Sequence, residues 1–184
     1  MKTKRTLVCG LVVGALAATL VATPADAQTR RLHDKRGDAP RGSDILSVKV
    51  THTKHRARVR IQMKKLGRDS HGILHPVGVY FDSKPKRPGA ELFIGFSGGV
   101  EVYRMKHGKP WFDGDPEQRC YHGVDLKLNE HKEFAVISAR HKLGCLGRPK
   151  AVRVRVETTS YRHHKERHDF APNGKRFTRP VRRG

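Results

Sequence analysis

Five residues near the middle of the chain match a pattern found around catalytic serines. Gly95-Phe96-Ser97-Gly98-Gly99 fits the G-x-S-x-G arrangement, in which a helix must follow the serine to present its hydroxyl on a strained turn. Here the next residues, Val100-Glu101-Val102, alternate as a strand does. We therefore expect a hairpin turn at Ser97 and a protein that is not an enzyme. A Ser97 hydrolase is the least favoured alternative.

Histidines and acids offer two kinds of metal ligand. His52 with His55, and His164 with His168, would bind a transition metal if the local backbone brought them together, but neither pair has an evident third ligand. Ca²⁺ prefers carboxylate oxygens, and several acids fall at expected strand ends and turns: Asp34, Asp38, Asp44, Asp82 and Glu91. Turn formation and capping explain these acids without a metal. We predict no cofactor, with Ca²⁺ as the alternative.

The first residues of the chain have the layout of a secretory signal peptide. A positive start with Lys2, Lys4 and Arg5 precedes an apolar run over 7–21, and Ala25-Asp26-Ala27 is a small-residue cleavage pattern. We expect residues 1–27 to be removed and the protein to be secreted. No later stretch is apolar enough to suggest a transmembrane segment.

Two cysteines, Cys120 and Cys145, remain after the signal peptide. In an exported chain such a pair predicts one disulfide, worth about 3 to 4 kcal/mol of stability on the chain-entropy account. Reactive or metal-binding thiols are the alternative, but the spacing fits no compact metal motif.

The charge of the chain is strongly positive. The formal charge is +22, and removing residues 1–27 takes away Lys2, Lys4, Arg5 and Asp26, which leaves +20. Solubility alone requires a net charge of only about 2 to 8 in a small domain. The excess predicts an acidic partner. All 12 histidines follow the signal peptide, so acidification would raise the charge further.

Short alternating runs predict the elements that position these residues. Residues 44–63 read as two strands and a turn with one apolar and one basic face, and further strands are expected at 77–82, 91–96, 100–105, 124–128, 134–138 and 151–158. Because no window has a convincing helical period, we predict an all-β fold, a single antiparallel β-sandwich. Residues 28–43 are expected to be a flexible lead-in, and 44–184 the sandwich domain with a basic tail.

Five cations fall at outward positions of the predicted strands, between inward aliphatic residues: Lys49, Arg58, Arg60, Arg153 and Arg155. If their strands share one sheet, the cations form a plate that would bind phosphate or sulfate polymers. Arginine suits such contacts because its guanidinium binds oxyanions in a bidentate manner.

Several sequence features together resemble a known group of proteins. They are the Gly37-Asp38 lead, Asp44-Ile45 opening a V-x-V strand, Val77 to Asp82, Cys145-Leu146-Gly147-Arg148-Pro149, and a closing Phe177 to Gly184. This layout looks like small exported actinobacterial proteins of unassigned function, and more distantly is similar to the jelly-roll sandwiches of DOMON and family 9 carbohydrate-binding modules. The resemblance implies a jelly-roll-like sandwich and export, and it implies no activity.

These features predict a secreted, non-enzymatic protein that associates electrostatically with acidic polymers of the cell envelope or extracellular matrix. Teichoic acid, an anionic lipid surface and extracellular nucleic acid are the candidate partners. The alternative is a carbohydrate- or calcium-dependent binding module that uses Trp111 and the turn acids.

Overall fold

The protein is all-β in a computed structural model, with two antiparallel sheets and one short helix, α1 (Gln118–Tyr121), among the described residues. The structure describes residues 27–67, 74–84, 86–87, 89–106, 109–110, 118–141, 143, 146–162, 165–174 and 176–184. The predicted signal peptide, apart from Ala27, lies outside these residues. So does Cys145, one partner of the predicted disulfide.

The first sheet has the strand order β1-β2-β3-β9-β8. Its strands are β1 (Gln28–His33), β2 (Ile45–His52), β3 (Arg56–Met63), β9 (Phe134–Arg140) and β8 (Val124–Asn129). β2 and β3 form the predicted two-faced ribbon, because their burial alternates between core and solvent along each strand.

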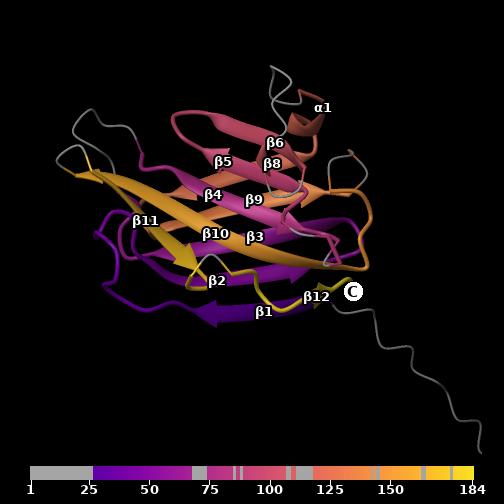
Figure 1. The fold of residues 1–184 in the computed structure, drawn as a ribbon, viewed down its shortest axis with the longest axis horizontal. Coiled ribbons are helices and arrows are strands. Elements are labelled where there is room, and N and C mark those ends of the chain that lie inside the picture. The colour runs from indigo at the N-terminus through magenta and orange to yellow at the C-terminus, as the bar shows by residue number, and fades with distance from the viewer. Residues whose placement is uncertain are drawn as a thin grey trace, which may run out of the picture.

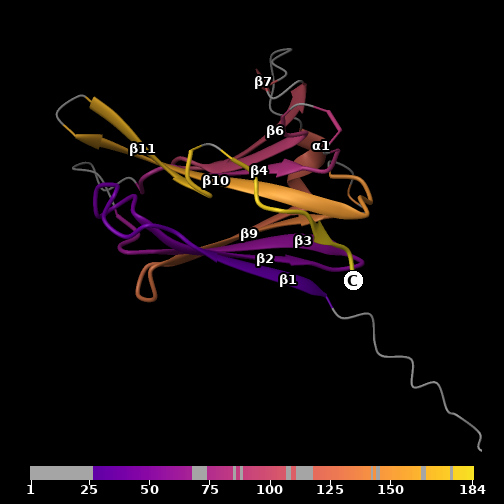
Figure 2. The same cartoon turned by 60° about the horizontal axis from the view of Figure 1, so that its bottom comes forward.

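The second sheet has the order β11-β10-β4-β5-β6-β7. Its strands are β11 (Lys165–Ala171), β10 (Ala151–Arg162), β4 (Val77–Asp82), β5 (Leu92–Phe96), β6 (Val100–Lys106) and β7 (Lys109–Pro110). The short strand β12 (Val181–Arg182) pairs with the start of β10. Figures 1 and 2 show this sheet as one layer lying against the first.

One hydrophobic core joins the two sheets. Val50 and Ile61 of the first sheet belong to the same buried cluster as Phe81 and Val154 of the second. Aliphatic residues at alternate positions therefore point into a shared interior, which is the packing of a β-sandwich.

The segment 28–43, expected to be a flexible lead-in, instead begins with a strand. All of β1 pairs antiparallel with β2, from Gln28 opposite His52 to His33 opposite Ser47. Its side chains are mostly exposed, so the composition of this segment gave no reason to expect a strand. The strand forms because its backbone hydrogen-bonds with N–H and C=O groups of β2 that would otherwise lack protein partners. The tail also contains β11, a strand that the sequence did not indicate. Farther along the tail, Val181 of β12 is buried in the core.

Candidate binding sites

The five cations predicted to form one plate lie on two different sheets. Lys49 is on β2 and both Arg58 and Arg60 are on the neighbouring β3, so these three share the outer face of the first sheet. Arg153 and Arg155 are on β10, in the second sheet. The structure thus unites three of the five and separates the other two, because alternation distinguishes inside from outside but does not say which sheet a strand joins.

Other cations join the three on the first sheet. Strand register places Arg31 opposite Lys49, Lys49 opposite Arg60, and both Arg60 and Lys127 opposite Val136, so one row of outward positions crosses five strands. The next rows add further arginines on β3 and β9. We call this surface the basic face, and it consists of Arg31, Lys49, Arg56, Arg58, Arg60, Lys127 and Arg140.

Opposing charge is scarce on the basic face. Among the described residues at outward positions of these five strands, Asp125 is the one acid, and it accepts hydrogen bonds from the Arg140 guanidinium at 3.1 and 3.3 Å. Like charges on directly opposite strand positions destabilise a sheet. The row from Arg31 through Lys49 to Arg60 therefore weakens the fold rather than supporting it.

Side chains of the basic face pack against one another at its centre. Val136 points outward at the centre of the row, yet it is only 3% exposed. Its cross-strand neighbours are Arg60 and Lys127, whose aliphatic stems cover such a residue while their charged ends remain in water. The Arg60 guanidinium lies 3.5 Å from the centre of the Phe134 ring, a cation–π contact that leaves its edge available for anions.

The two arginines of β10 are engaged within the second sheet. Arg153 donates to the fully buried carboxylate of Asp82, with Nε 2.8 Å from Oδ2. The Arg155 guanidinium lies 4.0 Å from the centre of the Tyr80 ring. Arg153 is thus a structural counter-ion, which accounts for it without an external partner.

Two of the five predicted calcium ligands lie together. Ligand oxygens of Asp34, Asp38 and Asp169 lie within 4.8 Å of one another. Burial, followed by the neighbouring Asp169 carboxylate, raises the pKa of Asp34 from 3.8 to about 7. One buried oxygen of Asp34 has no hydrogen-bond partner in the described part of the chain.

The other acids have structural partners. Asp44 accepts from the Gly37 N–H at 3.1 Å and pairs with Lys64 at 3.6 Å. Asp169 accepts from the N–H groups of Ile45 and Phe170. Glu91 accepts from the Ser83 N–H at 2.6 Å. Most of these carboxylate oxygens therefore hold the backbone, as capping predicts.

His52 pairs with His141 rather than with His55. The Nε2 atoms of the two buried rings are 3.2 Å apart, and each Nδ1 lies 3.0 Å from a backbone carbonyl, of Val181 for His52 and of Lys54 for His141. Burial lowers the pKa of both rings. Each neutral ring carries one N–H, so the pair has two protons for the three contacts: the one between the rings and the two to backbone carbonyls. Two of these three contacts can therefore be hydrogen bonds at once. In the other predicted pair, His164 lies outside the described residues.

Ser97 lies between two paired strands, β5 and β6, and its N–H donates to the Gly99 carbonyl at 3.1 Å. The strand-to-helix turn of a nucleophile elbow is therefore replaced by a hairpin turn. Trp111 and the acids at 113 and 115 lie outside the described residues.

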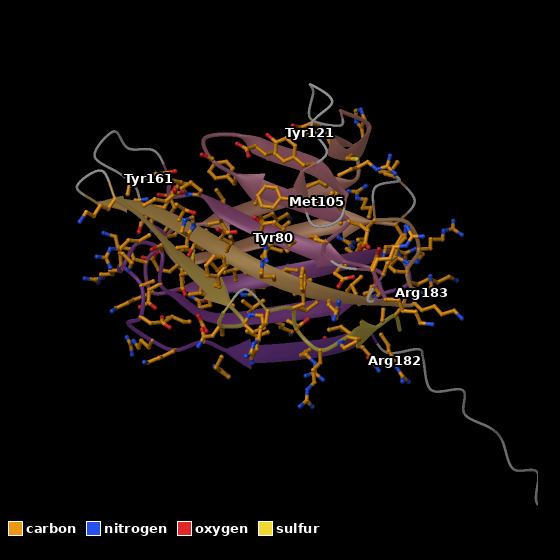
Figure 3. All side chains as sticks on the ribbon, viewed as in Figure 1. Tyr80, Met105, Tyr121, Tyr161, Arg182 and Arg183 are labelled. Atoms are coloured by element: carbon orange, nitrogen blue, oxygen red, sulfur yellow. The ribbon has the colours of Figure 1, made fainter. Side chains whose placement is uncertain are left out.

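A groove on the outer face of the second sheet is a feature that the sequence reasoning missed. It has a cavity volume of about 180 Å³ and is open to solvent on one side, and its lining includes Tyr80, Phe93, Glu101 and Glu157. Burial and the Glu157 carboxylate raise the pKa of Tyr80 to about 12, so its hydroxyl stays protonated and donates to Glu157 at 2.9 Å. Figure 3 shows Tyr80 near the middle of this sheet. The signal in the sequence was an aromatic residue at outward positions of three successive strands, at 80, 93 and 103.

Comparison with protein-family models gives no match for this chain, and comparison with curated proteins gives none either. Within the described residues, no helix has the length and apolar character needed to cross a membrane.

Proposed function

We propose that this is a secreted, non-enzymatic binding protein whose basic face associates with acidic polymers of the cell envelope or extracellular matrix. The observation that carries the proposal is the row of Arg31, Lys49, Arg60 and Lys127 across one sheet, with Arg56, Arg58 and Arg140 beside it. Teichoic acid, anionic lipid surfaces and extracellular nucleic acid all carry the repeated phosphates that such a surface attracts.

The spacing of the cations suits a repeating anion. Neighbouring strands are about 4.8 Å apart, and successive outward residues on one strand are about 7 Å apart. The basic face is thus a regular two-dimensional array rather than a single binding pocket. Such an array meets several phosphates of an extended polymer at once, and each contact releases counterions from it.

The mutual repulsion of these cations also favours a polyanion. Arg31, Lys49 and Arg60 stand opposite one another on adjacent strands, an arrangement that destabilises the sheet. A bound polyanion would offset this repulsion, so binding and folding stability should rise together.

The proposal includes two finer structural predictions, a jelly-roll-like strand arrangement and a Cys120–Cys145 disulfide. The disulfide is supported by the packing of neighbouring residues. A Cβ added at Gly123 would lie 2.9 Å from Cβ of Leu143, so the chain just after Cys120 contacts the chain just before Cys145. Cys120 itself is 1% exposed. A disulfide there would suit an exported protein.

Binding to inorganic polyphosphate over a range of NaCl concentrations tests the function. We expect the affinity to fall steeply with salt, and the variant Lys49→Gln/Arg58→Gln/Lys127→Gln to reduce the slope of log K against log salt by about 2 to 3, since each phosphate contact contributes about 0.7 to 0.9. All three side chains are exposed, so the fold should persist.

The matched control is Lys84→Gln/Lys86→Gln/Arg87→Gln. It removes the same charge from exposed residues between β4 and β5 of the second sheet. We expect the control to retain most of the slope. Equal losses in both variants would show that net charge alone attracts the polymer and that the basic face is not a site.

A further inference from the structure

The groove on the second sheet begins with two glycines on adjacent strands. Gly78 of β4 pairs directly with Gly95 of β5. A Cβ added at Gly78 would lie 2.5 Å from Phe93, and one added at Gly95 would lie 2.7 Å from the same ring. Because neither glycine has a side chain, Phe93 lies flat over them and presents a ring face at the floor of the groove.

Two tyrosines flank Phe93 on the neighbouring strands: Tyr80 lines the groove, and Tyr103 lies beside the groove without lining it. Tyr80, Phe93 and Tyr103 occupy one row of outward positions on β4, β5 and β6. The ring centres of Tyr80 and Phe93 are 4.8 Å apart, and those of Phe93 and Tyr103 are 6.0 Å apart with planes inclined by 26°. All three side chains are partly exposed. The result is an aromatic platform about three strands wide.

Carboxylates stand at the two ends of the glycine row, which runs along one side of the platform. The next outward row runs from Glu157 through Gly78 and Gly95 to Glu101, so an acid stands at each end of the glycine pair. Glu157 is fixed by the Tyr80 hydroxyl at 2.9 Å and by Nδ1 of His168 at 2.9 Å. Glu166 lies beyond, 3.7 Å from the other nitrogen of His168.

The residues that line this groove are acidic, and the nearest arginine, Arg155, covers the Tyr80 ring at one end, with its guanidinium 4.0 Å from the ring centre. The described lining residues include Glu101, Glu157 and Glu166 and no lysine or arginine, whereas the protein as a whole has a formal charge of +22. Acids concentrated around aromatic ring faces form the environment that binds organic cations, through cation–π attraction and ion pairing.

We infer that this groove binds a small organic ammonium ion, with the cationic head over the Phe93 ring and the carboxylates of Glu101 and Glu157 beside it. A polyanion is disfavoured there by three carboxylates. A neutral sugar would use the ring faces but would gain nothing from the concentrated negative charge. The cavity volume of about 180 Å³ suits a small molecule rather than a folded partner.

Calorimetric titration of the full protein with choline, ethanolamine and 3,3-dimethyl-1-butanol tests the inference. The last compound has the shape of choline without its charge. We expect saturable binding of at least one of the two cations and an affinity lower by about tenfold or more for the uncharged isostere. Binding of the isostere as tightly as choline, or of neither cation, would overturn the inference.

Three variants locate the site. Phe93→Leu keeps an apolar side chain over the glycines but removes the ring, and Glu101→Gln and Glu157→Gln each remove one charge; each should weaken cation binding by about fivefold or more. Glu130→Gln, an exposed acid after β8 on the other sheet, is the control and should not. Melting curves establish that each variant is folded. Equal loss in the control, or saturable binding of cellobiose that Phe93→Leu abolishes, would contradict an ammonium site.

Discussion

At the scale of single residues, Asp34 has a strongly raised pKa. Burial and the proximity of Asp169 raise its pKa from 3.8 to about 7. The folded state therefore holds a proton on Asp34 between these values while the unfolded chain does not. Stability from this group is fully present below pH 3.8 and is lost as the pH rises through about 7.

Replacing Asp34 with Asn should remove the loss of stability that ionisation of Asp34 causes at high pH. Asparagine resembles the protonated acid, so we expect Asp34→Asn to raise the free energy of unfolding by about 1 to 3 kcal/mol at pH 8. At pH 4.5 the effect should be much smaller. Urea denaturation at the two pH values measures the difference, with Glu130→Gln at an exposed acid as a control of equal charge change.

Calcium binding by this cluster of acids would contradict the prediction for Asp34→Asn. If the carboxylates of Asp34, Asp38 and Asp169 held a cation, added Ca²⁺ would raise the melting temperature of the protein, and Asp34→Asn would abolish the rise. Such a result would show that repulsion between these acids is relieved by a metal rather than by a proton.

The residue types alone did not predict which side chains contact one another, as the buried histidine pair shows. His52 and His55 are close in sequence, but His52 ends β2 with its side chain buried, whereas His55 lies in the turn before β3 and is exposed. The partner of His52 is His141, which is distant in sequence and arrives through the pairing of β3 with β9. Long-range contacts of this kind depend on strand order, which periodicity does not encode.

At the scale of elements, one ion pair joins β4 to β10. The Asp82 side chain is 0% exposed and that of Arg153 is 28% exposed. Removing the arginine leaves a buried carboxylate without its counter-ion, whereas removing the acid leaves an arginine that can reach water.

The two single variants should therefore differ. We expect Arg153→Met to lower the free energy of unfolding by about 3 to 5 kcal/mol, and Asp82→Asn to lower it by about 1 to 2 kcal/mol because asparagine still accepts hydrogen bonds. Chemical denaturation at pH 7 measures both. Equal losses would mean that the pair stabilises through its mutual attraction alone.

The strands with clean alternation were predicted well. Val48 and Val50 of β2, and Val152, Val154 and Val156 of β10, lie in the core as their spacing indicates. β1 escaped notice because Arg30 occupies an inward position of an edge strand, where the alternation of apolar and polar residues breaks down. β11 was missed for a similar reason, since its charged residues conceal the buried Asp169 and Ala171.

At the scale of the whole molecule, the two sheets have different outer surfaces. The first carries the basic face, and the second carries the aromatic groove with its carboxylates. The outward cations could be predicted from the sequence, but whether their strands share one sheet could not, because composition reports the total charge and not its distribution between layers. The groove was overlooked because each aromatic residue, taken alone, reads as ordinary strand packing.

The proposed disulfide is a property of the whole chain that can be measured directly. We expect peptide mass mapping without reductant to find Cys120 joined to Cys145, and Cys145→Ser to lower stability by about 2 to 4 kcal/mol. In the presence of reductant the wild type and the variant should become nearly equal. Thiol labelling of both cysteines in the folded, exported protein would contradict the bond.

The edge position of β1 has a further consequence. β1 hydrogen-bonds on one side only within the described sheet, and an open strand edge invites a second copy to continue the ladder. Any copy that docked there strand to strand would bring Arg30 and Arg31 against their own counterparts. The same positive charge that attracts an acidic polymer therefore disfavours pairing of β1 with a second copy. A polymer that neutralised the charge of this edge would allow two copies to pair through β1.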